Sequence, residues 1–243
     1  MVYKIFPVVI FALMAFTSNE KHPASAKQTS PIAPQAIAAN TKSNSEMKVA
    51  AVYGKLHSNH IPLPQLESFS EALQGFYQLK DKGIIQKDIL TVIDFSLSSN
   101  EKRLWVIDLA TNTVLINTFV AHGRNTGEEF ANSFSNQASS FKSSLGFYAT
   151  GEIYNGKHGK SLKLDGLEKG VNDNARERGV VMHAADYVSE SFIKNHDRLG
   201  RSQGCPAVPV ELTDEIIDMI KNKSCLFIYH PSRSLKTFPK LIS

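Results

Sequence analysis

One of the two cysteines of this chain lies in a tight turn, within the sequence GRSQGCPAVP at 200–209. A reactive cysteine needs a route to its thiolate, donors for a developing oxyanion and access for a substrate. Gly204 permits a positive φ or a close backbone approach, so the N–H groups of Gly204 and Cys205 can converge on a carbonyl oxygen. The turn therefore fits a nucleophile. Half of a disulfide and a small buried side chain are the alternatives.

A nucleophilic thiol also needs a base, and two histidines are placed to supply one. His183 ends the short apolar stretch GVVMH (179–183) and enters a polar turn, where a rigid strand can hold it into a cleft. His122, in AHGR, ends its own predicted strand in the same way. A structural role is the alternative for either residue, and the residues alone leave the choice open.

Two other uses of these side chains compete with catalysis. A Cys205–Cys225 disulfide would suit an exported chain with two cysteines, although Cys225 lies in the buried-strand pattern CLFIYH (225–230), where a small hydrophobe is expected. A zinc site from His183, His196 and Cys205 would have spacings of 13 and 9 residues, which match no compact zinc pattern. We therefore expect no metal and no cofactor.

The first residues are typical of an export signal. Lys4 precedes the apolar run FPVVIFALMAF (6–16), and ASA (24–26) offers a cleavage site, so we expect a signal peptide over 1–26. Eleven apolar residues are too few to cross a bilayer, which needs about 20. We expect an exported protein of the periplasm or cell envelope, which would touch a membrane only through an uncleaved signal.

Composition sets the remaining boundaries and excludes one class of partner. Residues 27–64 are rich in Ser, Thr, Asn, Pro and Ala and are predicted to be a disordered linker, which leaves 65–243 as one domain. The net charge of +4 is mild, and no basic run or aromatic ladder indicates nucleic-acid binding.

The apolar pattern predicts a mainly β (α+β) domain, because one helix is followed by a series of strands and then by helices. Helices are predicted over 66–83, 189–196 and 211–222, and strands over 89–97, 103–109, 114–121, 145–153, 179–183 and 225–230. The polar stretches 122–144 and 154–178 are predicted to be long loops, which commonly carry binding or catalysis.

The segment VVMHAADYVSESFIKNHDRLGRSQGCPAV (180–208) resembles the signature of the murein L,D-transpeptidase catalytic domain family, the YkuD-type fold. That family carries a histidine, a gap and then Ser-His-Gly-Cys. The stretches at 93–124 and 143–152 resemble strands of the same domain, and the likeness covers about residues 85–230. It implies an L,D-transpeptidase-like β-sandwich or barrel with a few peripheral helices.

The resemblance implies roles for the residues of the turn. Cys205 corresponds to the nucleophile, His183 to the general base, and the N–H groups of Gly204 and Cys205 to the oxyanion donors. Ser202 corresponds to the motif serine, which would hold the turn. We expect the imidazole and the converging N–H groups to lower the pKa of the Cys205 thiol.

The sequence departs from the family pattern in two places. Gln203 replaces the motif histidine, and its amide cannot titrate near neutral pH. The usual arginine two residues after the cysteine is absent, so Arg201, Arg198 or Arg124 would have to bind a substrate carboxylate, with His122 lining the substrate loop.

The implied activity is that of a peptidoglycan L,D-transpeptidase. Such an enzyme forms a cysteine acyl-enzyme on a tetrapeptide stem, releases D-Ala and transfers the acyl group to an amine. Attack by water instead would make the protein an L,D-carboxypeptidase. The other alternative, favoured by Gln203, is a non-catalytic cell-wall-binding module of the same fold.

Overall fold

The structure is a computed structural model that describes residues 46–58 and 60–233. The predicted signal peptide at 1–26 and the first part of the predicted linker lie outside the described residues.

A single sheet of eight strands forms the domain, in the order β3-β2-β1-β8-β4-β5-β6-β7. Its members are β1 (Ile89–Asp94), β2 (Leu104–Asp108), β3 (Thr113–Thr118), β4 (Gly146–Gly156), β5 (Gly159–Gly166), β6 (Val181–Ala184), β7 (Ala207–Val208) and β8 (Cys225–Tyr229). The β1–β8 and β6–β7 pairs are parallel and the others are antiparallel. The expected mainly β class is confirmed.

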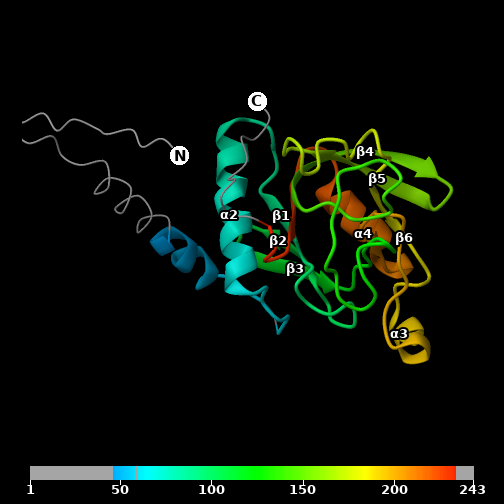
Figure 1. Cartoon of the computed structure of the whole chain (residues 1–243). Coiled ribbons are helices and arrows are strands. Elements are labelled where there is room, and N and C mark those ends of the chain that lie inside the picture. The colour runs from blue at the N-terminus through cyan, green and yellow to red at the C-terminus, as the bar shows by residue number, and fades with distance from the viewer. Residues whose placement is uncertain (1–45, 59, 234–243) are drawn as a thin grey trace, which may run out of the picture.

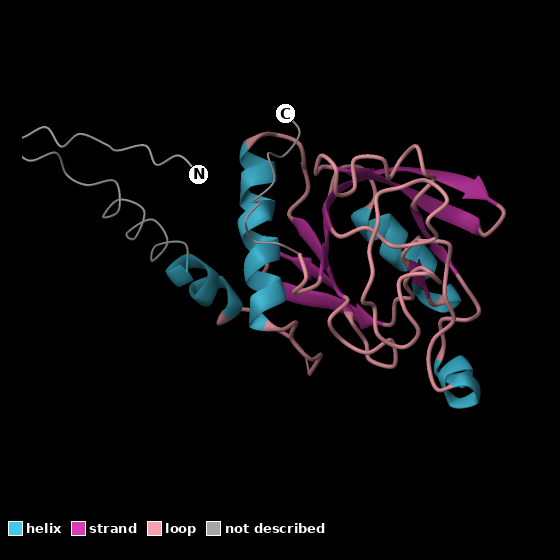
Figure 2. Ribbon diagram, viewed as in Figure 1, coloured by secondary structure: helices cyan, strands magenta, loops and turns pink. Residues whose placement is uncertain are grey.

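Helices cover both faces of this sheet, which explains why its central strands are buried throughout. Helix α2 (Leu66–Asp81) packs on one face and α4 (Val210–Ile220) on the other, with strands between them (Figures 1 and 2). Strand β8 shows the alternation: Leu226 and Ile228 join the core around α4, whereas Phe227 and Tyr229 join the core beneath α2. Helix α3 (Glu190–His196) is a short peripheral element capped by Ser189.

The two ends of the sheet approach each other and nearly close a barrel. Residues 121–123 continue beyond β3 and form isolated bridges with the far edge, where Ala121 pairs with Ala207 and Gly123 with Ser202. Backbone bonds join Ala121 N–H to the Ala207 carbonyl at 2.9 Å and Ser202 N–H to the His122 carbonyl at 2.9 Å. The turn that carries Cys205 therefore lies on this seam.

The prediction of a long loop over 154–178 is wrong at its beginning. Strand β4 runs to Gly156, and β5 returns beside it as an antiparallel hairpin. The β5 sequence GKSLKLDG offers only Leu162 and Leu164 as large apolar residues, too short an alternation to indicate a strand. The two-residue strand β7 is likewise too short to produce a pattern.

The predicted disordered linker is wrong over its last part. Residues 46–53 form a helix, and Val49 on it is buried with the α2 core. Further along, the indole N–H of Trp105 donates to the carbonyl of Pro62 at 2.7 Å. A few apolar residues at suitable spacing are enough to dock this polar segment on the domain, so the ordered unit begins before residue 65.

In the described part of the chain, no helix combines the length and the apolar character needed to cross a membrane.

Candidate active site

Cys205 and His183 line the same pocket, which has a volume of about 590 Å³. Strand register explains the juxtaposition. His183 of β6 pairs with Ala207 of β7, and Cys205 precedes Ala207 by two residues. The pocket therefore forms where the seam of the sheet meets the β6–β7 edge. Its walls come from the β4–β5 hairpin, from the loop at 139–141, and from segments before and after β6.

The cysteine turn is held by its own serine and glycine. Ser202 Oγ donates to the Cys205 carbonyl at 2.6 Å and accepts the Gly204 N–H at 3.0 Å. Gly204 has φ = +121°, and a Cβ there would lie 2.8 Å from the Lys142 carbonyl oxygen. Only glycine fits both constraints.

This arrangement corrects the expected pair of oxyanion donors. The Gly204 N–H is already used by Ser202 and points into the turn. The Cys205 N–H has no partner among the described residues, and neither has that of Gln203. Those two groups, rather than Gly204 and Cys205, are the available donors at the turn.

The predicted lowering of the Cys205 pKa is wrong. Burial raises the pKa of this thiol above its ordinary value, and the Val181 N–H and the cations Arg178 and Lys157 offset the effect only in part. The resting thiol donates a long hydrogen bond to the carbonyl oxygen of Gly179, with Sγ and oxygen 3.8 Å apart. The environment favours S–H over the thiolate.

His183 is held as a neutral imidazole with a defined tautomer. Its Nδ1–H donates to the Ala184 carbonyl at 2.8 Å, which leaves Nε2 as the acceptor. Burial lowers the pKa of His183, and the nearby charges of His158 and Lys157 act in the same direction. A buried, unprotonated imidazole with a free Nε2 can accept a thiol proton.

His122 is not the base, and the expectation that it lines the substrate loop is also wrong. Its ring is buried below the seam, where Nδ1 accepts from Arg103 at 2.8 Å and Nε2–H donates to the Gly127 carbonyl at 3.2 Å. It does not line the pocket of Cys205. Burial and the Arg103 charge lower the pKa of His122 to about 4, so it stays neutral.

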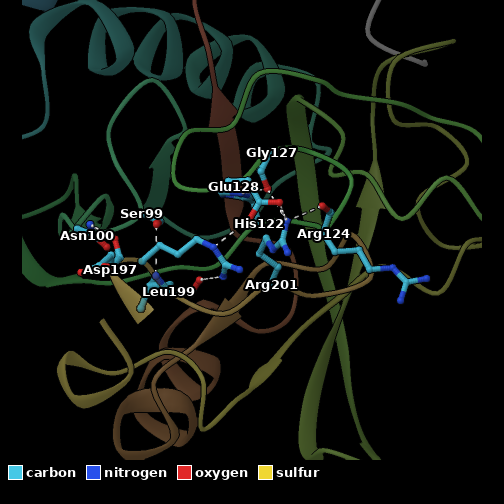
Figure 3. Close-up of polar contacts among 10 residues, drawn as sticks. Ser99, Asn100, His122, Arg124, Gly127, Glu128, Asp197, Leu199 and Arg201 are labelled. Atoms are coloured by element: carbon cyan, nitrogen blue, oxygen red, sulfur yellow. Dashed lines mark hydrogen bonds and ion pairs between the residues drawn. The ribbon is translucent and has the colours of Figure 1, made fainter. Parts of the chain in front are cut away.

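The arginines predicted to bind substrate lie in different surroundings (Figure 3). Arg201 lines the pocket, but its Nη1 already donates to the carbonyls of Arg124 and Gly127 and to Glu128. Arg198 also pairs with Glu128, at 3.0 Å. The Arg124 side chain extends away from this cluster, over the ring of Phe141 at 4.0 Å, and does not line the pocket.

Several titratable pocket residues were not predicted from the sequence. Arg178 precedes β6, Tyr154 lies on β4, Lys157 and His158 form the tip of the β4–β5 hairpin, and Tyr187 follows β6. The two hairpin residues could have been found only by recognising the hairpin, because nothing else links positions 157 and 158 to Cys205. Arg178 ends the stretch 154–178, which the sequence predicts to be a long loop that could carry binding or catalysis, without pointing to any one residue in it.

The alternatives of a disulfide and a zinc site lack support in the geometry. Both cysteines are free, and Cys225 is buried in the core beneath α2 rather than at the pocket. His196 stacks on Phe192 of α3 and does not line the pocket. Among the described residues no group of three or more metal-ligating side chains is assembled.

The chain belongs to the L,D-transpeptidase catalytic domain family, whose sequence model it matches over residues 63–229. The family is one of acyltransferases that act in the cell envelope.

No curated protein matches the chain. Solved structures that it resembles include an L,D-transpeptidase from Mycobacterium smegmatis (12% identity, 59% of each chain, TM-score 0.38). They also include an L,D-transpeptidase from Enterococcus faecium (14% identity, 59% of this chain and 50% of that one, TM-score 0.37). A third is the helical cell shape determining protein Pgp2 from Campylobacter jejuni (12% identity, 61% and 53%, TM-score 0.37). The match spans about three fifths of the length of the first of these chains.

Proposed function

We propose that this protein is a cysteine acyltransferase that acts on peptidoglycan peptide stems as an L,D-transpeptidase. The observation that supports it most is the pairing of β6 with β7, which brings an accessible thiol and a neutral imidazole with a free Nε2 to one pocket. Lys157, Arg178 and Arg201 also line this pocket, and none of the described residues that line it is Asp or Glu. Such a lining suits a peptide that carries free carboxylates.

In the first half-reaction, the thiol passes its proton to Nε2 of His183 as sulfur attacks the carbonyl carbon between stem residue three and D-Ala four. The negative oxygen of the tetrahedral intermediate can accept the N–H of Cys205. When the C–N bond breaks, the proton on Nε2 goes to the departing amine. D-Ala leaves, and the stem remains on Cys205 as a thioester.

In the second half-reaction, the amine of a neighbouring stem gives a proton to His183 and attacks the thioester carbon. The C–S bond breaks, the proton on His183 goes to the departing sulfur and restores the thiol, and a cross-link has formed. If water attacks instead, the product is a tripeptide and the protein is an L,D-carboxypeptidase. Because burial favours the thiol form of Cys205, proton transfer to His183 must accompany attack in either case.

The test is to incubate the chain with a purified disaccharide-tetrapeptide and to measure released D-Ala, cross-linked dimer and protein mass. We expect D-Ala release and a transient thioester on Cys205. Cys205→Ala should abolish both, and His183→Gln should cost nearly as much, because nucleophile and base act as one unit. His196→Gln is the matched control, since His196 is exposed on α3 and should leave activity unchanged.

The competing function is a non-catalytic wall-binding module, favoured by Gln203 in the turn and by the raised pKa of the thiol. It predicts that the wild-type chain binds murein yet releases no D-Ala and forms no thioester. That result would contradict the proposed activity.

A further inference from the structure

The tip of the β4–β5 hairpin places a second imidazole against the proposed base. Gly156 and Gly159 are paired at the end of the hairpin, so Lys157 and His158 form its turn. Two residues beyond Gly159, Ser161 of β5 pairs with His183 of β6. The tip of the hairpin therefore lies close to His183, the β6 residue that pairs with Ser161.

The rings of His158 and His183 stack face to face, with centroids 4.4 Å apart and planes 22° from parallel. Both side chains line the pocket of Cys205. His183 is held at Nδ1 by the Ala184 carbonyl, so stacking on its ring fixes the one remaining freedom, the tilt about that hydrogen bond. His158 is otherwise exposed at the hairpin tip.

We propose that His158 is a positioning residue of the active site, whose imidazole covers the ring of His183, fixes its orientation and keeps it unprotonated. The inference rests on the proposed function only in calling His183 the base. His158 does not need to touch the substrate or the thiol to act in this way.

The physical reason is that the stacked ring of His158 disfavours a positive charge on His183. Two imidazolium ions in face-to-face contact repel each other, and the cover reduces the access of water that would solvate a charge on His183. The other charged or titratable groups lining the pocket are Tyr154 and Lys157 on the hairpin, Arg178 before β6, Tyr187 after it, and Arg201 and Cys205 on the turn. None of these described residues is a carboxylate, so no Asp or Glu among them would stabilise a second positive charge.

The experiment is an NMR titration of the His183 ring in the full chain, assigned through the loss of its signal in His183→Gln. We compare wild type with His158→Ala, which removes the ring, and with His158→Phe, which keeps an aromatic ring that cannot be protonated. His196→Ala is the matched control, because His196 also stacks on an aromatic neighbour but lies outside the pocket.

We expect the His183 midpoint to move to higher pH in His158→Ala, to move less in His158→Phe and to stay in place in His196→Ala. In the D-Ala release assay, His158→Ala should lower kcat/KM at both pH values, because the ring of His183 is less well oriented, and the loss should be about threefold or more larger at pH 6 than at pH 8. A uniform loss at both pH values would indicate a merely structural role and would overturn the proposal.

A His183 midpoint that is the same in His158→Ala and wild type, or lower, would also overturn it. The NMR readout needs no enzymatic turnover. If the midpoint shifts while no variant releases D-Ala, the proposed function fails and the role of His158 stands. If the wild type is active and the midpoint does not move, the proposed function stands and the proposed role of His158 fails.

Discussion

The environments of Cys205 and His183 both favour neutral forms. Burial raises the pKa of the thiol and lowers that of the imidazole, so the resting pair is S–H and neutral imidazole rather than a thiolate–imidazolium pair. The cations Arg178 and Lys157 oppose the shift of the thiol, and an incoming anionic stem would weaken their effect. Proton transfer is therefore expected during attack.

A prediction at this scale concerns the reactivity of Cys205 toward iodoacetamide. Because the resting thiol is protonated, alkylation should be slow at pH 7. Its rate should still be rising above pH 9, at a higher pH than for a free thiol. The measurement is the labelling rate against pH by peptide mass. Cys225 is the internal control and should stay unlabelled in the folded chain, since it is fully buried. Fast labelling at pH 7 would contradict the neutral pair.

His122 gives a second residue-scale prediction, on stability. Its pKa is lowered to about 4 in the folded chain, from an ordinary value near 6.5. As the pH falls from about 6.5 to 4, unfolded His122 takes up a proton that the folded form refuses, so stability is lost across this window. The loss approaches about 1.4 kcal/mol per pH unit at most.

His122→Gln, which cannot titrate, should therefore flatten the decline of the free energy of unfolding between pH 6.5 and 4. It should be less stable than wild type at pH 8, because the bonds to Arg103 and Gly127 are altered. Urea unfolding at a series of pH values measures both effects. His196→Gln should keep the wild-type slope, and an unchanged slope in His122→Gln would refute the assignment.

Among the elements, the loop at 122–144 is held in part by Arg178, which lies outside it. The guanidinium donates to the carbonyls of Ser135 and Lys142, at 2.9 and 2.7 Å, and to the hydroxyls of Ser140 and Ser144. The same loop contacts the cysteine turn, where Ser143 Oγ donates to the Gly204 carbonyl at 3.3 Å. Arg178 thus connects the pocket wall to the turn that carries Cys205.

Arg178→Met should loosen this loop without unfolding the sheet. The carbonyls that lose their donor cost about 1–3 kcal/mol, and amide hydrogen exchange over 135–144 should speed up. Arg176→Met is the matched control, because Arg176 pairs with Asp165 and Glu152 away from the pocket. Equal exchange over 135–144 in the two variants would contradict the role of Arg178.

An element or site residue could be predicted from the sequence where the pattern that indicates it lies within one short stretch of the chain. The strands from β1 to β3, β6 and β8, and the helices α2 and α4, have clear apolar periods, and the sequence predicts each of them. The pairing of His183 with Cys205 followed from a motif in which both residues lie close in the chain. His158 and Arg178 reach the pocket through pairings between distant segments, which leave no mark in the local pattern.

At the scale of the whole molecule, the sheet keeps its two cores apart. The α4 core and the seam support the pocket, whereas the α2 core and the segment at 46–64 lie on the opposite face. That segment does more than touch the surface. The His57 N–H donates to the Asn112 carbonyl at 2.7 Å, and the His57 carbonyl accepts the Val114 N–H at 2.9 Å. It therefore extends the edge of the sheet beside β3.

The last prediction follows from this separation. A chain that begins at residue 65 should unfold at lower urea concentration than one that begins at 46. It loses the burial of Val49 and of its apolar neighbours, together with the bonds made by Pro62 and His57. We expect a loss of about 3 kcal/mol or more from the apolar contacts alone. Because the pocket lies across the sheet, the rate of Cys205 alkylation without urea should be the same in both chains. Equal urea midpoints would show that the segment adds nothing to the fold, and a changed alkylation rate would show that the two faces are coupled.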